Sequence, residues 1–173
     1  ESVLPKAVLD PGIFNRWGPD FAVEHGLVLA CNEGAVMTVG FGHRYPSVEV
    51  WSTSRVDQPW RVDDEGIDAV SDLLHAAHVA VSDDVPANEE WHYRPMGTGV
   101  AVPWGIILKL RISTLAGFEG GTKIYVNTIS PAALAAMLLP KLFQARAAGR
   151  IAPMDLGDEC EIPRGVLAAT WVR

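Results

Sequence analysis

The sequence contains few cysteines, few lysines and no long hydrophobic run, and each shortage excludes a class of protein. The two cysteines, Cys31 and Cys160, lack the spacing of a metal site, which indicates reduced thiols in a cytoplasmic protein and leaves a single disulfide as the alternative. Unbroken apolar runs, such as residues 106–108, are far too short to cross a bilayer. We therefore expect a cytoplasmic protein with no membrane partner.

Lysine is scarce, and the net charge is −7 with a pI near 5.1. Nucleic-acid binding needs clustered lysine and arginine, whereas the charged runs at residues 63–65 and 158–159 are acidic. The sequence therefore predicts no nucleic-acid partner. The preference for arginine over lysine, together with abundant Ala, Val and Gly, indicates a GC-rich bacterial genome.

Cofactor and nucleophile fingerprints are missing as well. Residues 119–123 lack the Gly-Lys-Ser/Thr ending of a phosphate-binding loop, residues 97–99 fall short of a dinucleotide fingerprint, and no Gly-x-Ser-x-Gly motif is present. We therefore predict no cofactor. A signal-peptide pattern is also absent, but the first residue is Glu1 rather than Met, so a processed N-terminus stays open.

The residues that are present suffice for a globular fold. A chain of 173 residues with 49% hydrophobic content can bury a sizeable core, and we predict a single domain over residues 1–173 with an irregular segment at 1–20. The patterns follow one another as strands, helix, strands, helix and strand. This order predicts an α+β fold, in which two principal helices pack on one face of a mainly antiparallel sheet.

The first half carries three strand patterns and one helix pattern. Strands are expected at residues 21–30, 35–40 and 47–54, and in the third of these apolar and polar side chains alternate. Asp63 is the expected N-cap of a helix that runs to about Val81.

The second half carries further strand patterns and the clearest helix. Strand patterns lie at residues 100–102, 105–113, 123–128 and 166–172. A hairpin turn is expected at 119–121. Ser130, followed by a proline, predicts a helix over residues 131–148, which Pro140 should kink or split.

Two similar tetrads, each set among glycines, carry the side chains best suited to chemistry. The first is His43, Arg44, Tyr45 and Pro46, and the second is His92, Tyr93, Arg94 and Pro95. Histidine moves protons near neutral pH, and arginine binds carboxylates and phosphates. If the two segments converge in space, they form a polar pocket for a small acidic molecule.

The second tetrad and the residues before it supply the predicted catalytic groups, His92, Glu90, Glu89 and Tyr93. A carboxylate beside an imidazole fixes its tautomer, and a tyrosine hydroxyl can donate a proton or hold an oxyanion. Arg94 and Trp91 are predicted to bind the substrate. Arg94 would bind the anionic group of the substrate. The alternative is a polar connecting loop with Trp91 in the core.

The first tetrad supplies further predicted substrate contacts through Arg44, His43 and Tyr45. Gly40 and Gly42 would let a ligand or another strand approach the backbone closely. The alternative is a tight hairpin whose last residues begin the next strand.

Three histidines are candidate metal ligands. His75 and His78 lie three residues apart on the first predicted helix, and His92 could complete a three-histidine site. The helical wheel instead places His78 in the apolar stripe and His75 toward acidic neighbours. We therefore predict no metal.

These features together predict a cofactor-independent bacterial enzyme of small-molecule metabolism, with secondary metabolism as one setting. It would perform general acid–base chemistry, such as cyclisation, condensation, isomerisation or dehydration, on a small acidic substrate that can be aromatic. The alternative is a non-catalytic ligand-binding or assembly module. A homodimer is left open. The six tryptophans are expected mainly in the core or at an interface, and one or two can line an aromatic substrate pocket.

Overall fold

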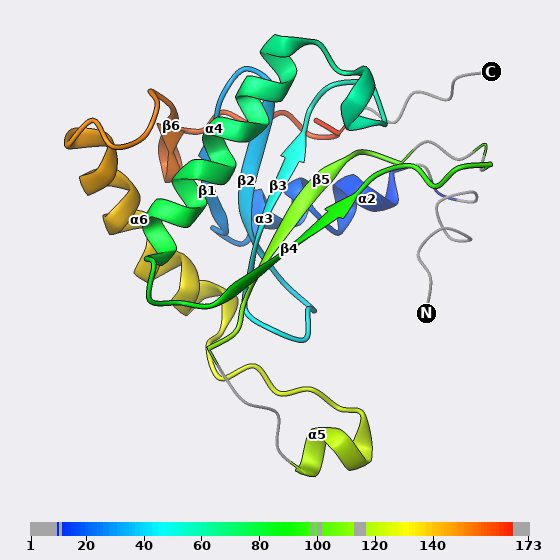
Figure 1. Cartoon of the computed structure of the whole chain (residues 1–173), viewed down its shortest axis with the longest axis vertical. Helices are drawn as coiled ribbons and strands as arrows, with labels where there is room; N and C mark the ends of the chain where they lie inside the picture. The colour runs from blue at the N-terminus through cyan, green and yellow to red at the C-terminus, as the bar shows by residue number, and fades with distance from the viewer. Residues whose placement is uncertain (1–9, 11, 98, 100–101, 113–116, 168–173) are drawn as a thin grey trace.

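The fold is built on a six-stranded antiparallel sheet with the strand order β4-β5-β3-β2-β1-β6 (Figure 1). This computed structural model describes residues 10, 12–97, 99, 102–112 and 117–167. The strands are β1 (Val28–Cys31), β2 (Ala35–Gly40), β3 (Ser47–Ser52), β4 (Ala87–His92), β5 (Gly105–Leu110) and β6 (Asp155–Leu156). β5 pairs with β3 on one side and with β4 on the other. β4 is therefore one edge of the sheet, and β6, which pairs with β1, is the other.

Two long helices, α4 (Asp64–Val81) and α6 (Pro131–Ala147), pack against each other and against one face of the sheet (Figure 1). Each begins at its predicted cap: Asp63 accepts a hydrogen bond from the Gly66 N–H at 3.0 Å, and Ser130 accepts one from the Ala133 N–H at 3.2 Å. The chain stays helical through Pro140, so the proline does not split α6. The predicted α+β fold with two principal helices is confirmed. No helix within the described ranges combines the length and apolarity needed to span a membrane.

The alternation predicted for the third strand separates the core from the opposite face of the sheet. Val48 and Val50 are fully buried in the core cluster that includes side chains of α4 and α6. Their neighbours Glu49 and Trp51 face the other way, as does Ile107 of β5, which lies opposite Glu49 in the register. This second face carries the candidate site.

Two predictions for the N-terminal part are wrong. The segment at 1–20 was expected to be irregular, but α2 (Ile13–Arg16) and the start of α3 (Pro19–Glu24) lie within it, and the strand expected at 21–30 begins only at β1. Pro19 occupies the first turn of α3, where its missing N–H is not needed, so the proline starts a helix rather than breaking one.

The strand predicted at 123–128 and the hairpin turn at 119–121 are also wrong. Residues 117–122 form the short helix α5 (Gly117–Thr122), which projects away from the sheet (Figure 1), and residues 123–128 contain no strand. The Thr122 hydroxyl donates to the Phe118 carbonyl at 2.7 Å, and Lys123 follows in the left-handed region at φ 60°. The segment therefore forms local helical hydrogen bonds, because a strand there would have no partner in the sheet.

The remaining strand predictions differ at their ends. The strand expected at 105–113 stops at Leu110, and Val102 lies outside any strand; residues 100–101, 113 and 168–172 fall outside the described residues. Two single-turn 3-10 helices, η1 (Pro59–Arg61) and η2 (Gly157–Glu159), complete the described elements. The segment before the second tetrad, for which a polar connecting loop was the alternative, is the edge strand β4, because its backbone pairs with β5 from Ala87 to His92.

Candidate functional site

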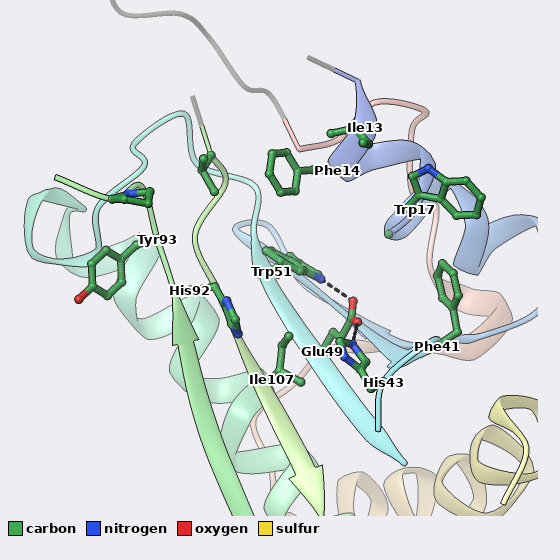
Figure 2. A pocket seen from close by; sticks show the side chains of 13 residues that line it. Ile13, Phe14, Trp17, Phe41, His43, Glu49, Trp51, His92, Tyr93 and Ile107 are labelled. Atoms are coloured by element: carbon green, nitrogen blue, oxygen red, sulfur yellow. Dashed lines mark hydrogen bonds and ion pairs between the residues drawn. The ribbon is translucent and has the colours of Figure 1, made fainter. Parts of the chain in front are cut away.

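A cavity of about 630 Å³ lies between α2 and the face of the sheet opposite α4 and α6 (Figure 2). Its described lining is mostly apolar and aromatic, with Ile13, Phe14 and Trp17 from α2 on one side and Trp51 and Ile107 from the sheet on the other. A few polar side chains converge among them. A cavity of this size and character is typical of a small-molecule site.

The carboxylate of Glu49 is the polar centre of this cavity (Figure 2). One of its oxygens lies 2.5 Å from Nε2 of His43, and the other accepts a hydrogen bond from the indole N–H of Trp51 at 2.8 Å. The Glu49 side chain is only 8% exposed, so these bonds replace the water that it loses. A carboxylate at Nε2 favours the imidazole proton on that nitrogen, which leaves Nδ1 as the acceptor in the neutral ring.

Two glycines allow His43 to reach Glu49. A Cβ on Gly40 would lie 2.8 Å from Cδ2 of His43 and 3.0 Å from Oε1 of Glu49, which is too close for a side chain. Gly42 has φ +72°, in the left-handed region that favours glycine. The close approach expected at these glycines is found at Gly40 and involves side chains of the protein itself, whereas a Cβ on Gly42 would meet no atom within 4 Å.

The second tetrad reaches the same cavity from β4. His92 ends that strand, and His92 and Tyr93 line the cavity together with His43 (Figure 2). Pro95 also belongs to the lining. The two tetrads therefore meet, although each contributes only part of its side chains.

Glu90 lies beside His92 on the same face of β4. One Glu90 oxygen is 3.6 Å from Nε2 of His92 and 2.6 Å from Nζ of Lys109. The hydrogen bond from Lys109 lowers the pKa of Glu90, and the charge of His92 contributes further in the same direction. Glu90 is therefore an ionised carboxylate next to the His92 ring.

Glu89 and Trp91 lie on the opposite face of the strand, toward α4. Glu89 has one oxygen 2.8 Å from Nε2 of His78, and its other oxygen accepts from the Trp91 indole N–H at 3.1 Å. Trp91 also stacks on Trp104, with ring centroids 6.5 Å apart. The structure thus separates these two predicted site residues from His92 and Glu90, because successive side chains of a strand point to opposite faces.

The two arginines of the tetrads have partners outside the cavity lining. The Arg44 guanidinium stacks over the Tyr125 ring at 4.2 Å and lies 5.7 Å from the centre of the Tyr45 ring. Arg94 forms an ion pair with Asp57, with Nε and Oδ2 2.5 Å apart. Neither these arginines nor Tyr45 belong to the described lining.

Sequence reasoning missed several lining residues. Glu49 and Trp51 had a usable signal, because the alternation of β3 places both on the face away from the valines. Phe14 had none, and the signal for Trp17 was only that it is one of six tryptophans, of which one or two can line an aromatic pocket.

The described part of the chain holds no group of three or more His, Cys, Asp or Glu side chains arranged to bind a metal ion. His78, one of the three histidines weighed for such a site, pairs with Glu89 instead.

Comparison with solved structures defines the class of fold. The chain resembles an ADP-glucose phosphorylase from Arabidopsis thaliana solved with bound ADP-glucose (TM-score 0.59, 19% identity, covering 70% of this chain and 45% of that one). It also resembles a uridylyltransferase (TM-score 0.62, 16% identity, covering 82% of this chain and 48% of that one). A third similar structure is a GalT-like protein from Arabidopsis thaliana (TM-score 0.57, 20% identity, covering 70% of this chain and 46% of that one). At these identities the likeness establishes the fold alone, and the chain spans about half the length of each.

The family follows from the sequence match. A family model described as "Domain of unknown function (DUF4921)" matches residues 3–169, so the chain belongs to this family. Comparison with curated proteins gives no match.

Proposed function

We propose that the chain binds a nucleotide-type small molecule in the cavity between α2 and β3 and acts as a group-transfer enzyme there. The observation that carries this proposal is the buried Glu49 carboxylate, which holds His43 and Trp51 at the floor of an aromatic cavity. Such a site offers apolar surfaces for a flat ring and an oriented imidazole for proton transfer.

The shape and chemistry of the cavity support a ligand that contains a nucleobase. Phe14 and Trp17 on α2 and Trp51 on the sheet supply aromatic surfaces, and stacking on such surfaces suits any base. The fold is shared with a phosphorylase solved with ADP-glucose and with a uridylyltransferase, which favours nucleotides over other ring-containing ligands. A nucleotide is also acidic and aromatic, the substrate character expected from the sequence.

The oriented imidazole defines the chemistry we propose. With Glu49 at Nε2, Nδ1 of His43 can accept the proton of an acceptor hydroxyl. The acceptor oxygen then forms a bond to phosphorus, the phosphate anhydride bond breaks, and the leaving phosphate departs with the bonding electrons. Glu49 stabilises the imidazolium that results, as a carboxylate does in other histidine-centred sites.

His92 is the second proton-transfer group in this proposal. It lines the cavity with Tyr93, and its Nε2 lies 3.6 Å from a Glu90 oxygen. His92 would donate a proton to the leaving phosphate, and Tyr93 would contact the ligand at the rim. This division keeps the acid–base role predicted for His92 and Glu90 but assigns no cyclase or lyase reaction.

A non-catalytic nucleotide-binding module is the rival reading. It is favoured by the fact that both Glu49 oxygens already bond to protein donors. The two readings differ in turnover. An enzyme breaks the anhydride bond of ADP-glucose or UDP-glucose in the presence of an acceptor alcohol and releases glucose 1-phosphate or the nucleoside monophosphate, whereas a module binds these ligands unchanged.

Calorimetric titration with ADP-glucose, UDP-glucose, ADP, UMP and adenosine tests the proposal, with glucose 1-phosphate as the ligand that lacks a base. We expect binding of at least one base-containing ligand and none of glucose 1-phosphate. Glu49→Gln should weaken that binding roughly tenfold or more, because hydrogen bonds to a charged group are lost. Turnover, where present, should fall by roughly 100-fold or more in His43→Asn.

Glu89→Gln is the matched control. It alters a carboxylate with the same kinds of partner, a histidine and a tryptophan, on the opposite face of the sheet. Its affinity and turnover should equal those of the wild type. Binding that Glu49→Gln and Glu89→Gln weaken equally, or a panel with no binding at all, would refute a nucleotide site in this cavity.

A further inference from the structure

The two cysteines, distant in sequence, meet at one edge of the sheet. Cys31 is the last residue of β1 and lies directly opposite Asp155 of β6. Cys160 follows η2, and its thiol donates a hydrogen bond to the carbonyl of the same Asp155 at 3.3 Å. Both cysteines therefore border Asp155, which places them side by side at this edge of the sheet.

The surroundings leave this thiol pair reachable from solvent. Both cysteines are free and only partly buried, and Cys31 lines a surface hollow with Asn32 and Arg146. Burial raises the pKa of the Cys31 thiol, and burial together with the neighbouring Cys31 raises the pKa of Cys160 well above its usual range. Both thiols are therefore protonated and slow to react at neutral pH, and their shared position at Asp155 rather than their acidity makes them a pair.

We propose that Cys31 and Cys160 form a reversible intramolecular disulfide when the protein meets a low-molecular-weight disulfide such as oxidised glutathione. The Cys31 thiolate attacks the glutathione disulfide and releases one glutathione thiolate. The Cys160 thiolate then attacks the mixed disulfide and releases the second. The two protein thiols lose two electrons and two protons, and two molecules of reduced glutathione carry them away.

The disulfide would restrain residues 160–167, which connect the sheet edge at Cys160 to α2 and α3. Beyond Cys160 the chain runs back to α2, where Asn15 and Leu167 exchange two hydrogen bonds of 2.8 Å each. The Gly165 N–H also donates to Asp20 of α3 at 3.0 Å. A disulfide at Cys160 therefore fixes one end of residues 160–167. The other end is hydrogen-bonded to α2, the helix that lines the cavity.

The test uses the full chain after incubation with oxidised glutathione and, separately, with dithiothreitol. Peptide mapping without reduction should show a cross-linked peptide containing Cys31 and Cys160 and no glutathione adduct. The melting temperature of the oxidised form should exceed that of the reduced form by roughly 10 °C, because the cross-link closes a long loop. Hydrogen exchange of residues 161–167 should slow, and dithiothreitol should reverse each change.

Cys31→Ser and Cys160→Ser are the matched controls. Each should take up one glutathione at the remaining cysteine and lose the rise in melting temperature. Should either variant fail to fold, wild-type protein alkylated in its reduced form serves the same purpose. Separate glutathione adducts on both wild-type cysteines without a cross-linked peptide, or a cross-link that lowers the melting temperature, would overturn the proposal.

Discussion

Glu49 and Glu89 make the same set of bonds on opposite faces of the sheet. Each accepts a hydrogen bond from the tryptophan two residues later in its own strand, and each has a histidine Nε2 beside its other oxygen. Burial distinguishes them, since the Glu49 side chain is 8% exposed and that of Glu89 is 34% exposed. Water screens the interactions of Glu89 more than those of Glu49. The Glu49 carboxylate therefore provides the stronger electrostatic field for a ligand.

This difference predicts unequal costs for removing the two carboxylates. Glu49→Ala leaves the half-buried Trp51 and His43 without their partner and should reduce the free energy of unfolding by roughly 2–3 kcal/mol. Glu89→Ala removes a more solvated set and should cost less than about 1 kcal/mol. Urea denaturation of both variants measures the two values. Equal costs would show that Glu49 is as solvated as Glu89.

Gly105 should be required for the position of the Trp51 ring. The two residues lie opposite each other in β5 and β3, and a Cβ on Gly105 would lie 2.6 Å from Cε3 of Trp51. Gly105→Ala should therefore destabilise the protein by roughly 1–3 kcal/mol and change the near-UV circular dichroism of the tryptophans. Gly120→Ala, where the added Cβ meets no atom within 4 Å, is the control and should leave both unchanged.

The N-cap of α6 should contribute measurably to stability. The Ser130 hydroxyl accepts a hydrogen bond from the Ala133 N–H, so Ser130→Ala should lower the free energy of unfolding by roughly 1 kcal/mol. Ser71→Ala, at an exposed position inside α4, changes the same atoms without a cap and should have little effect. A comparable change in both variants would assign the loss to something other than capping.

Glu159 should make stability depend on pH in the acid range. Its bidentate pair with Arg146, supported by the Leu156 N–H, lowers the pKa of Glu159 to about 2. Because the folded-state pKa lies below the ordinary value of 4.5, the contribution is fully present above pH 4.5 and is lost as the pH falls toward about 2.

Denaturation midpoints measured at about pH 5, 3.5 and 2.5 test whether stability depends on the protonation of Glu159. Glu159→Gln should lower the midpoint at the highest of these pH values and reduce its fall toward the lowest. Glu161→Gln, in the segment that follows, removes one charge as well and should retain the wild-type pH profile. A Glu159→Gln profile parallel to that of the wild type would contradict the assignment.

Trp17 should matter for binding and little for folding. Its side chain is 59% exposed and lines the cavity from α2, so Trp17→Ala should change the free energy of unfolding by less than about 0.5 kcal/mol. If a nucleobase stacks there, the dissociation constant should rise about tenfold or more. Phe118→Ala, which removes a ring of similar exposure on α5, should leave the affinity unchanged in the same titration.

Local signals predicted the elements that depend on neighbouring residues. The N-caps of Asp63 and Ser130 hold because each cap bonds to an N–H three residues further along. The alternation of β3 holds because its valines pack against a helix-covered core. The strand predicted at 123–128 fails because a strand needs a partner, and the sheet offers that segment none.

By itself, the sequence determined the α+β class, the two long helices and the two segments that carry His43 and His92, because caps, periodicity and residue chemistry are local properties. The tertiary structure decided which side chains share a site. It placed Glu49 and Trp51 beside His43 and turned Glu89 and Trp91 to the opposite face. It also brought α2 over the sheet to close the cavity. These pairings arise from strand register and from packing between distant segments, and single-residue patterns do not encode either.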